Sequence, residues 1–496
     1  MGQVIDKDTF SESEYLVFRE RLDACLDVLG AVIERPGFGA GATTIGAELE
    51  LSLVDAGCRP LPCNEAIRTA AGDSRIALEL NRYNLELNSS PVPLAGRPFE
   101  ALGKELAALL ELVADTAAAH GGRPAVIGIL PTVGPSDLGQ AAITEVARYR
   151  ALSNGLRRLR QSPFRIQIAG TDRLDLVSDD ITPEGANTSF QVHMRVDPVR
   201  FARVYNAAQL ATAAVLAVAG NSPTFLGRRL WDETRIALFK QAVDDRPAGP
   251  HRTRARTSLG TGWLRGGAGE LFADSVRRHE PILPVIADAD PWAPAAAGEA
   301  PALGELRLHQ GTVWPWNRAI YDPAAGGHLR IEMRVLPAGP TVTDMMANAA
   351  YLIGLTLWIG DQDERWTYAL PFERADRNFY RAAQDGLSAE LTWPAFRPDQ
   401  TRTVRAADLV GESLPAAREG LLAAGVTPAE ADPLLEVIGA RASSGQTGAA
   451  WQRAALAAAM REPSSRDPFA VMLGRYLDHA ATGLPVHTWP VVTRPV

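Results

Sequence analysis

The stretch TTIGAELELSLVD (Thr43–Asp55) alternates between apolar and polar or acidic residues and contains several β-branched side chains. This pattern predicts a β-strand that ends at the Ala-Gly pair directly after it. Because successive side chains of a strand point to opposite faces, Glu48 and Glu50 face one space, while the leucines beside them face the other way. The strand therefore presents two carboxylates on one face.

A second acidic stretch is LELNRYNLELN (Leu78–Asn88), which we expect to form one or two further strands. Glu79 and Glu86 stand seven residues apart in it. Glu86 shares its face with the asparagines on either side of it, opposite two leucines. This strand repeats the pattern of the first one, with an acid on its polar face.

Two more predicted strands alternate in the same way. In ANTSFQVHMRV (Ala186–Val196), His193 falls on the polar face, and in GHLRIEMRVL (Gly327–Leu336), Glu332 and Arg334 share a face opposite an apolar one. Taken singly, such a polar face is usually exposed to water. A lone histidine in a strand is likewise more often structural than a ligand.

Glutamates without lysines on several strands favour a cation site instead. Exposed sheet faces tend to mix both signs of charge, whereas clustered like charges need cations. Mg²⁺ takes oxygen ligands, commonly carboxylates and substrate phosphates. The candidate ligands are Glu48, Glu50, Glu79, Glu86 and Glu332, and His193 gains weight as a ligand only in their company.

Composition excludes several classes of function. Of the 496 residues, 46% are hydrophobic and 22% charged, which is typical of a globular protein with a large core. The net charge of -8 argues against nucleic-acid binding as the main function. Three cysteines without a repeated C-x-x-C argue against a disulfide scaffold or a thiolate zinc site and fit a reducing cytoplasm. We expect no membrane partner, because the N-terminus shows no secretory signal and the most apolar run, Ala207–Ala219, is too short to span a bilayer.

The remaining segments are predicted to be helices, one strand and connectors. We expect helices over Ser11–Glu34, Pro98–His120, Pro198–Gly220 and Thr343–Gly360, and a short buried strand over Ala125–Leu130. Residues 244–267 are predicted to be a long loop, and residues 291–304 a Pro/Ala-rich surface connector. Beyond residue 400 the chain is rich in Ala and Leu and carries no obvious chemistry. We therefore predict a catalytic domain over residues 1–400 and a C-terminal helical appendage over residues 401–496.

The common nucleotide, zinc and serine-hydrolase motifs are missing from the sequence, which has no P-loop, G-x-G-x-x-G, H-E-x-x-H or G-x-S-x-G. A bound nucleotide would have to be held by metals and arginines. RRLWDETR (Arg228–Arg235) and TVWPWNR (Thr312–Arg318) combine arginine with tryptophan, which suits anion binding and stacking. Core packing is the commoner role of such tryptophans.

The order and spacing of these motifs resemble the glutamate-cysteine ligase superfamily, specifically its carboxylate-amine ligase branch. The resemblance spans roughly residues 45–360 and rests on GAELEL, the seven-residue interval in ELNRYNLE, the strand with His193, GNSPTFLGRRLWDETR and RIEMR. It implies an α+β, glutamine-synthetase-like fold, in which a curved antiparallel sheet flanked by helices forms a funnel for ATP, Mg²⁺ and glutamate.

The resemblance also implies roles for individual residues. The metal-binding set is Glu48, Glu50, Glu79, Glu86, His193 and Glu332. Arg334 matches the arginine that contacts the transferred phosphoryl group, so Arg334 and Glu332 are the expected catalytic residues. Arg235 and Arg318 are the expected cofactor-binding arginines. The interval between Glu79 and Glu86 would place one acid beside the substrate and the other beside phosphate.

Two departures from the family pattern bear on the substrate. TSFQVHM (Thr188–Met194) has one histidine where relatives often have the pattern T-H-x-H-V, and Asn317 replaces the acid of a W-D-x-R segment. Both changes put the identity of the amine in doubt before they affect the ATP chemistry.

We therefore expect ATP-dependent amide bond formation through an acyl phosphate. The γ-carboxylate of L-glutamate is the expected donor, and L-cysteine, which would give the first step of glutathione synthesis, is the first candidate amine. Two alternatives stay open. A phosphotransferase of the guanidino-kinase type would make a stable N-phosphate, and a non-catalytic protein would only bind Mg-nucleotide or an amino acid.

Overall fold

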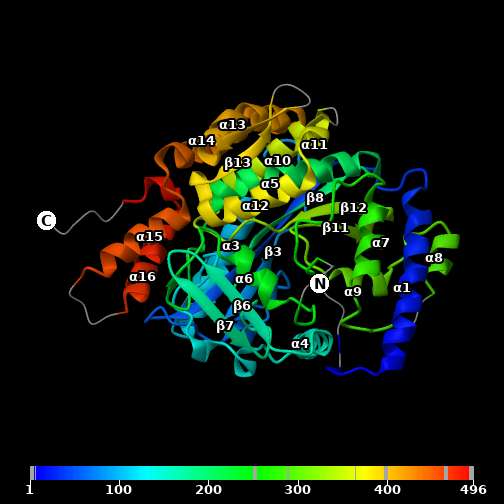
Figure 1. Ribbon diagram of the computed structural model, residues 1–496, viewed down its shortest axis with the longest axis horizontal. Helices are drawn as coiled ribbons and strands as arrows, with labels where there is room; N and C mark the ends of the chain where they lie inside the picture. The colour runs from blue at the N-terminus through cyan, green and yellow to red at the C-terminus, as the bar shows by residue number, and fades with distance from the viewer. Residues whose placement is uncertain are drawn as a thin grey trace.

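The predicted acidic strand β1 (Thr44–Asp55) lies inside the main sheet (Figure 1). It pairs with four other strands, all antiparallel to it. The computed structural model describes residues 5, 7–249, 254–287, 290–362, 365–395, 400–462 and 467–490. Over these residues the sheet has eight strands, with the order β11-β12-β8-β1-β3-β2, and with β4 and β5 also paired to β1. The predicted α+β class with a curved antiparallel sheet is confirmed.

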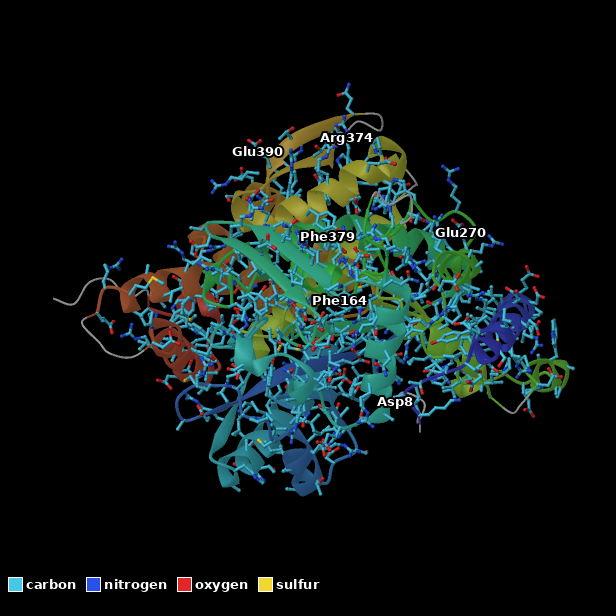
Figure 2. The ribbon with its side chains drawn as sticks, turned by 60° about the horizontal axis from the view of Figure 1, so that its bottom comes forward. Asp8, Phe164, Glu270, Arg374, Phe379 and Glu390 are labelled. Carbon is cyan, nitrogen blue, oxygen red and sulfur yellow. The ribbon has the colours of Figure 1, made fainter. Side chains whose placement is uncertain are left out.

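The other strands of this sheet are β2 (Ile76–Leu78), β3 (Asn84–Asn88), β4 (Val92–Pro93), β5 (Gly122–Ala125), β8 (Phe190–Val196), β11 (Asn317–Asp322) and β12 (His328–Met333). Three separate hairpins are β6 (Phe164–Ala169) with β7 (Arg173–Ser178), β9 (Thr224–Phe225) with β10 (Arg228–Arg229), and β13 (Glu390–Pro394) with β14 (Thr401–Arg405). In Figure 2, Phe164 marks the β6–β7 hairpin, and Phe379 lies on a helix over residues 372–385.

The helices are α1 (Glu12–Ile33), α2 (Asn64–Ala71), α3 (Pro98–Ala119), α4 (Ala147–Arg160), α5 (Phe201–Ala219), α6 (Arg235–Ala242), α7 (Ala268–Arg278), α8 (Trp292–Ala296), α9 (Gly304–Gln310), α10 (Val342–Asp361), α11 (Arg365–Ala369), α12 (Phe372–Asp385), α13 (Ala406–Ala423), α14 (Pro428–Ser444), α15 (Gly448–Ala459) and α16 (Pro468–Ala480). The predicted helices agree with α1, α3, α5 and α10 to within a few residues. Ser11 caps α1 in a capping box with Glu14.

One face of the sheet is apolar and packs against helices. Leu49, Leu51 and Leu53 of β1 are fully buried, and removing one such side chain typically costs about 2–5 kcal/mol. Helices α5 and α10 pack against each other in this layer, with α12, α13 and α14 near them (Figure 1). The polar face of the sheet is left free for the acids.

By length and composition alone, helices α5 and α10 are long and apolar enough to cross a membrane. The most apolar window of the first lies within residues 198–219 and that of the second within residues 342–361, and 89% and 78% of these windows are buried inside the protein. Burial of this kind is typical of core helices. The apolar run Ala207–Ala219 noted in the sequence belongs to α5.

The short strand predicted over Ala125–Leu130 lies a few residues earlier in the structure, as β5. Strand β5 ends at Ala125, and the apolar residues after it are buried without continuing the strand. Gly128 lies so close to Pro337 that a Cβ atom there would be 3.1 Å from it. A short buried apolar run has no periodicity that separates a strand from other buried backbone, so the sequence placed the element a few residues too late.

The predicted boundary between residues 400 and 401 falls beside β14, whose partner β13 precedes it in the chain. Helix α13 packs along α10, and α14 contacts α10 and α13. The C-terminal helices therefore share the helical layer that covers the sheet. Their division from a catalytic domain stays a prediction.

A buried histidine gives this fold a pH dependence. Burial of His309, together with the nearby Arg256, lowers the pKa of its imidazole to about 3, and the ring contacts the Ser275 carbonyl oxygen at 3.3 Å. Since the unfolded chain binds the proton near pH 6.5 and the folded chain does not, this histidine destabilises the fold as the pH falls below 6.5.

We expect His309→Gln to remove part of this pH dependence. Between pH 6.5 and 5 the wild type should lose about 1.5 kcal/mol more unfolding free energy than the variant. Urea denaturation at both pH values measures the difference. Parallel losses in the two proteins would show that His309 is protonated in the folded state.

Candidate active site

The strand register brings the predicted acids together on one face of the sheet. Glu50 of β1 lies opposite Glu86 of β3, and His193 of β8 lies opposite Glu332 of β12. Glu48 of β1 lies opposite Gln191 of β8, which precedes His193 by two residues. The alternation read from the sequence is therefore present in all four strands.

Three of the predicted ligands form a compact group. The Nε2 atom of His193 lies 3.1 Å from Oε1 of Glu48 and 3.7 Å from Oε1 of Glu332. One ligand atom from each residue lies within 4.8 Å of the other two. Both ring nitrogens of His193 are buried and make no hydrogen bond with the described residues. Two carboxylates and an imidazole whose close polar neighbours are these carboxylates suit a divalent cation such as Mg²⁺.

Two arginines hold Glu332 in its charged form. Arg318 on β11 donates to both carboxylate oxygens, with Nη2 at 2.9 Å from Oε1, and Nη1 of Arg334 lies 3.3 Å from Oε1. Burial alone would raise the pKa of Glu332, but Arg318, Arg334 and His193 lower it well below its usual range. Burial also raises the pKa of Glu48, and the adjacent His193 outweighs this effect, so the net shift is downward.

A second group of acids lies next to the first and contains Glu50, Glu79, Glu86 and Glu184. Burial and the charges of Glu48 and Glu50 raise the pKa of Glu86 to about 8. Burial and the charge of Glu50 raise the pKa of Glu184 to about 8. The pKa of Glu79 is raised well above its usual value by burial and by Glu86. Carboxylates in this arrangement need either protons or a bound cation to offset their repulsion.

Glu184 is a site residue that sequence reasoning missed. It lies in the turns before β8, directly after Pro183, so no strand alternation places it beside the other acids. Its carboxylate interacts with Glu50 and Arg334 through space. Only the fold of the chain around β1 brings it to the site.

Gln191 connects the two groups of acids. Its side-chain Nε2 donates to Oε1 of Glu50 at 2.9 Å, and its side-chain Oε1 accepts from Nη1 of Arg334 at 2.6 Å. The backbone N–H of Ser189 donates to the other oxygen of Glu50 at 2.7 Å. Gln191 stands in the segment that departs from the T-H-x-H-V pattern, and here it orients both a charged arginine and an acid.

Arg235 and Asn317, which were also singled out in the sequence, make no hydrogen bond or ion pair with these acids among the described residues, although the charge of Arg235 acts on Glu50. Nε of Arg235 lies 2.8 Å from Glu233 and its Nη2 donates to the Val335 carbonyl at 2.6 Å, both in the protein interior. Its predicted role in binding a cofactor stays a prediction. Asn317 is fully buried on the opposite face of β11 from Arg318, where its amide donates to Gln209 and Thr212 of α5.

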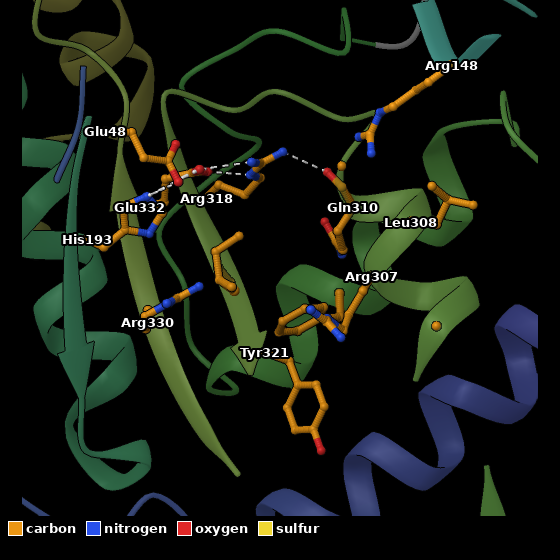
Figure 3. Close-up of a pocket in the computed structure, with 15 residues that line it drawn as sticks. Glu48, Arg148, His193, Arg307, Leu308, Gln310, Arg318, Tyr321, Arg330 and Glu332 are labelled. Atoms are coloured by element: carbon orange, nitrogen blue, oxygen red, sulfur yellow. Dashed lines mark hydrogen bonds and ion pairs between the residues drawn. The ribbon is translucent and has the colours of Figure 1, made fainter. Parts of the chain in front are cut away.

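A cavity of about 380 Å³ opens beside the first group of acids (Figure 3). Glu48, His193 and Glu332 lie at one end of it, next to Arg318. The lining residues that carry charge or a polar group away from this end are Arg148, Arg307, Gln310, Tyr321 and Arg330. Of the predicted cofactor-binding arginines, the cavity therefore contains Arg318 and not Arg235.

The fold is similar to that of a solved glutamate–cysteine ligase. Glutamate–cysteine ligase from Francisella tularensis, solved in complex with AMP, superimposes with a TM-score of 0.55 at 11% sequence identity, over 92% of this chain and 96% of that chain. A bifunctional glutathione synthetase from Pasteurella multocida gives a TM-score of 0.48 at 11% identity, over 94% of this chain and 55% of that chain, which is too low to establish a shared fold by itself.

The sequence match is more specific. Residues 44–267 match glutamate-cysteine ligase family 2, which confirms the predicted resemblance to the glutamate-cysteine ligase superfamily. This region contains the acids of β1 and β3 and His193, whereas Arg318, Glu332 and Arg334 follow it in the chain. No curated protein sequence matches the chain significantly.

Proposed function

We propose that this protein is an ATP-dependent ligase that joins the γ-carboxylate of L-glutamate to an amine, with L-cysteine as the first candidate. The observation that carries this proposal is the arrangement of Glu48, His193 and Glu332 beside Arg334, next to a second group of acids. The family match and the fold support a carboxylate-amine ligase. We further propose that the enzyme acts in the cytoplasm, in keeping with its three free cysteines.

The proposed reaction has two steps. In the first, an oxygen of the donor carboxylate attacks the γ-phosphorus of ATP, the bond to the β-phosphate oxygen breaks, and an acyl phosphate and ADP form. In the second, the amine attacks the acyl carbon, phosphate leaves, and the amine gives up a proton. The product is an amide, and each turnover releases one ADP and one phosphate.

The residues of the site supply charge and orientation for these steps. Mg²⁺ held by Glu48, His193 and Glu332 would supply positive charge to the transferring phosphoryl group. Arg334 would contact the same group. Its guanidinium is held by Gln191 and Glu332 between the two groups of acids, which supports this role. Arg318 keeps Glu332 ionised and oriented.

Phosphate release from Mg-ATP tests the proposal. The assay contains L-glutamate, then L-cysteine and a panel of other amines, with mass spectrometry of the products. A new γ-glutamyl amide would establish the ligase and identify the amine. Reversible phosphorylation of ADP without free phosphate would point to the guanidino-kinase alternative. Tight Mg-ATP binding with no product from any carboxylate and amine would leave the binding protein.

Arg334→Lys is expected to lower turnover by about tenfold to a hundredfold. Lysine keeps the positive charge but loses the planar fork that reaches Gln191 and Glu332 together. Because the loss concerns the transferred group, kcat should fall more than the KM for ATP rises. Initial rates at varied ATP measure both constants, and a change confined to KM would assign Arg334 to ground-state binding alone.

A further inference from the structure

Two arginines of the cavity take no part in the site described above. Arg148 belongs to the first turn of α4 and Arg307 to α9, and both line the cavity that ends at the Glu48–His193–Glu332 group. Neither guanidinium forms a hydrogen bond or ion pair with another described residue. Their neighbours in the lining are paired, since Arg318 binds Glu332 and Arg330 lies 3.4 Å from Asp322.

Both arginines come from anchored elements. In α9, the buried Glu305 lies 2.9 Å from Nε of Arg21 on α1 and accepts from the Ala287 N–H at 3.1 Å. In α4, the hydroxyl of Tyr149 donates to the Leu78 carbonyl at 2.6 Å, at the end of β2. The backbone that carries each guanidinium is thus fixed, and only the ends of the side chains are left to meet a ligand.

The charge in the cavity is unevenly distributed. Its lining contains four arginines and two glutamates, and both glutamates belong to the proposed cation site. In Figure 3 the guanidinium group of Arg330 is directed into the cavity, and that of Arg148 points toward Gln310 at the end of α9. The cavity therefore offers a cation site at one end and excess positive charge along the rest, which suits a ligand with several negative charges in a row.

We propose that Arg148 and Arg307 bind the phosphate chain of the nucleoside triphosphate, at the phosphates that are not transferred. This inference rests on the proposed function and adds two residues to it. A guanidinium pairs with phosphate through two parallel N–H donors. The two arginines provide donors for more than one phosphate, whereas the α-carboxylate of L-glutamate, the one that is not activated, would need only one of them.

Binding of Mg-ADP and of Mg-tripolyphosphate, measured by calorimetry, tests this inference without relying on turnover. We expect Arg148→Met and Arg307→Met each to raise both Kd values by at least about tenfold, and to reduce their dependence on salt. The KM for ATP should rise in step, with kcat and the KM for L-glutamate nearly unchanged. Arg307→Lys should recover part of the binding.

Two matched controls come from the same elements or from their neighbours. Arg150 lies two residues after Arg148 on α4, is exposed and contacts Asp8, and Arg277 on α7 is exposed. Arg150→Met and Arg277→Met should bind both probes as the wild type does. Because neither arginine makes a hydrogen bond or ion pair with another described residue, and Arg307 acts on Asp322 only through its charge, their variants should also unfold close to the wild-type temperature.

Three results would overturn the inference. The first is wild-type affinity for both probes in the two variants. The second is unchanged nucleotide binding with a raised KM for the carboxylate donor, which would assign the arginines to that substrate. In both cases the proposed ligase stands. In the third, the wild type itself binds neither probe, and then the proposed function fails together with this inference.

Discussion

Glu48→Gln is expected to lower the rate of ATP-dependent product formation by at least about a hundredfold. Glutamine has nearly the same shape, so the change removes one negative charge from the proposed cation site and little else. The charge matters because Glu48 is held ionised beside His193, with Oε1 at 3.1 Å from Nε2. Phosphate release and product formation at saturating ATP and Mg²⁺ measure the loss.

The fold should survive this substitution. Glu48 is one of several acids that repel each other, and it raises the pKa of Glu86, so its neutralisation relieves repulsion in the sheet. We expect the unfolding temperature to stay within a few degrees of the wild type. Glu111→Gln, at an exposed position on α3, is the matched control and should keep full activity. Near-normal turnover in Glu48→Gln would remove the carboxylate from the mechanism and with it the proposed cation site.

Strand alternation is the part of the site that could be predicted from the sequence. A period of two residues decides which side chains share a face, and β1, β3, β8 and β12 obey it. The faces therefore place Glu48, Glu50, Glu86 and Glu332 correctly relative to the apolar core. Their pairing across strands depends on the sheet order, which the alternation does not give. The resemblance to a known family grouped them as one metal-binding set without that order.

Residues outside regular strands could not be predicted in this way. Glu184 lies in turns, and Arg148 and Arg307 are single arginines on helices. The helical period predicts which face of a helix is buried, but not which cavity the polar face borders. Arg235 was singled out by a motif with arginine and tryptophan. Its guanidinium lies against Glu233, and its role in binding a cofactor stays a prediction.

Arg441→Met is expected to lower the free energy of unfolding by about 3–5 kcal/mol. Arg441 on α14 is fully buried, and its Nη2 lies 2.7 Å from Oδ1 of Asp344 on α10. Its Nη1 donates to Asn348 at 2.7 Å and to the Val218 carbonyl of α5 at 3.1 Å. Removing the guanidinium leaves the Asp344 carboxylate buried without its cation, which is the costly way to break such a pair.

An exposed pair between neighbouring helices provides the control. Arg418 on α13 donates to both carboxylate oxygens of Asp432 on α14, at 2.6 and 3.1 Å. Its loss in Arg418→Met should change the stability far less than Arg441→Met does, because water screens the charges. Adding Asp344→Asn to Arg441→Met should restore part of the stability, since it neutralises the unpaired carboxylate. Urea denaturation of the wild type and the three variants measures their free energies of unfolding.

The shape of the unfolding transition carries further information about the C-terminal helices. Arg441 connects α14 to α10 and α5, which cover the sheet that carries the acids. If residues 401–496 unfold together with the rest, Arg441→Met shifts one cooperative transition, and activity is lost at the same urea concentration as the helical signal. A separate early transition that leaves ATP turnover intact would instead show that these helices form an independent appendage. A midpoint equal to that of the wild type would contradict the expected cost of the unpaired Asp344.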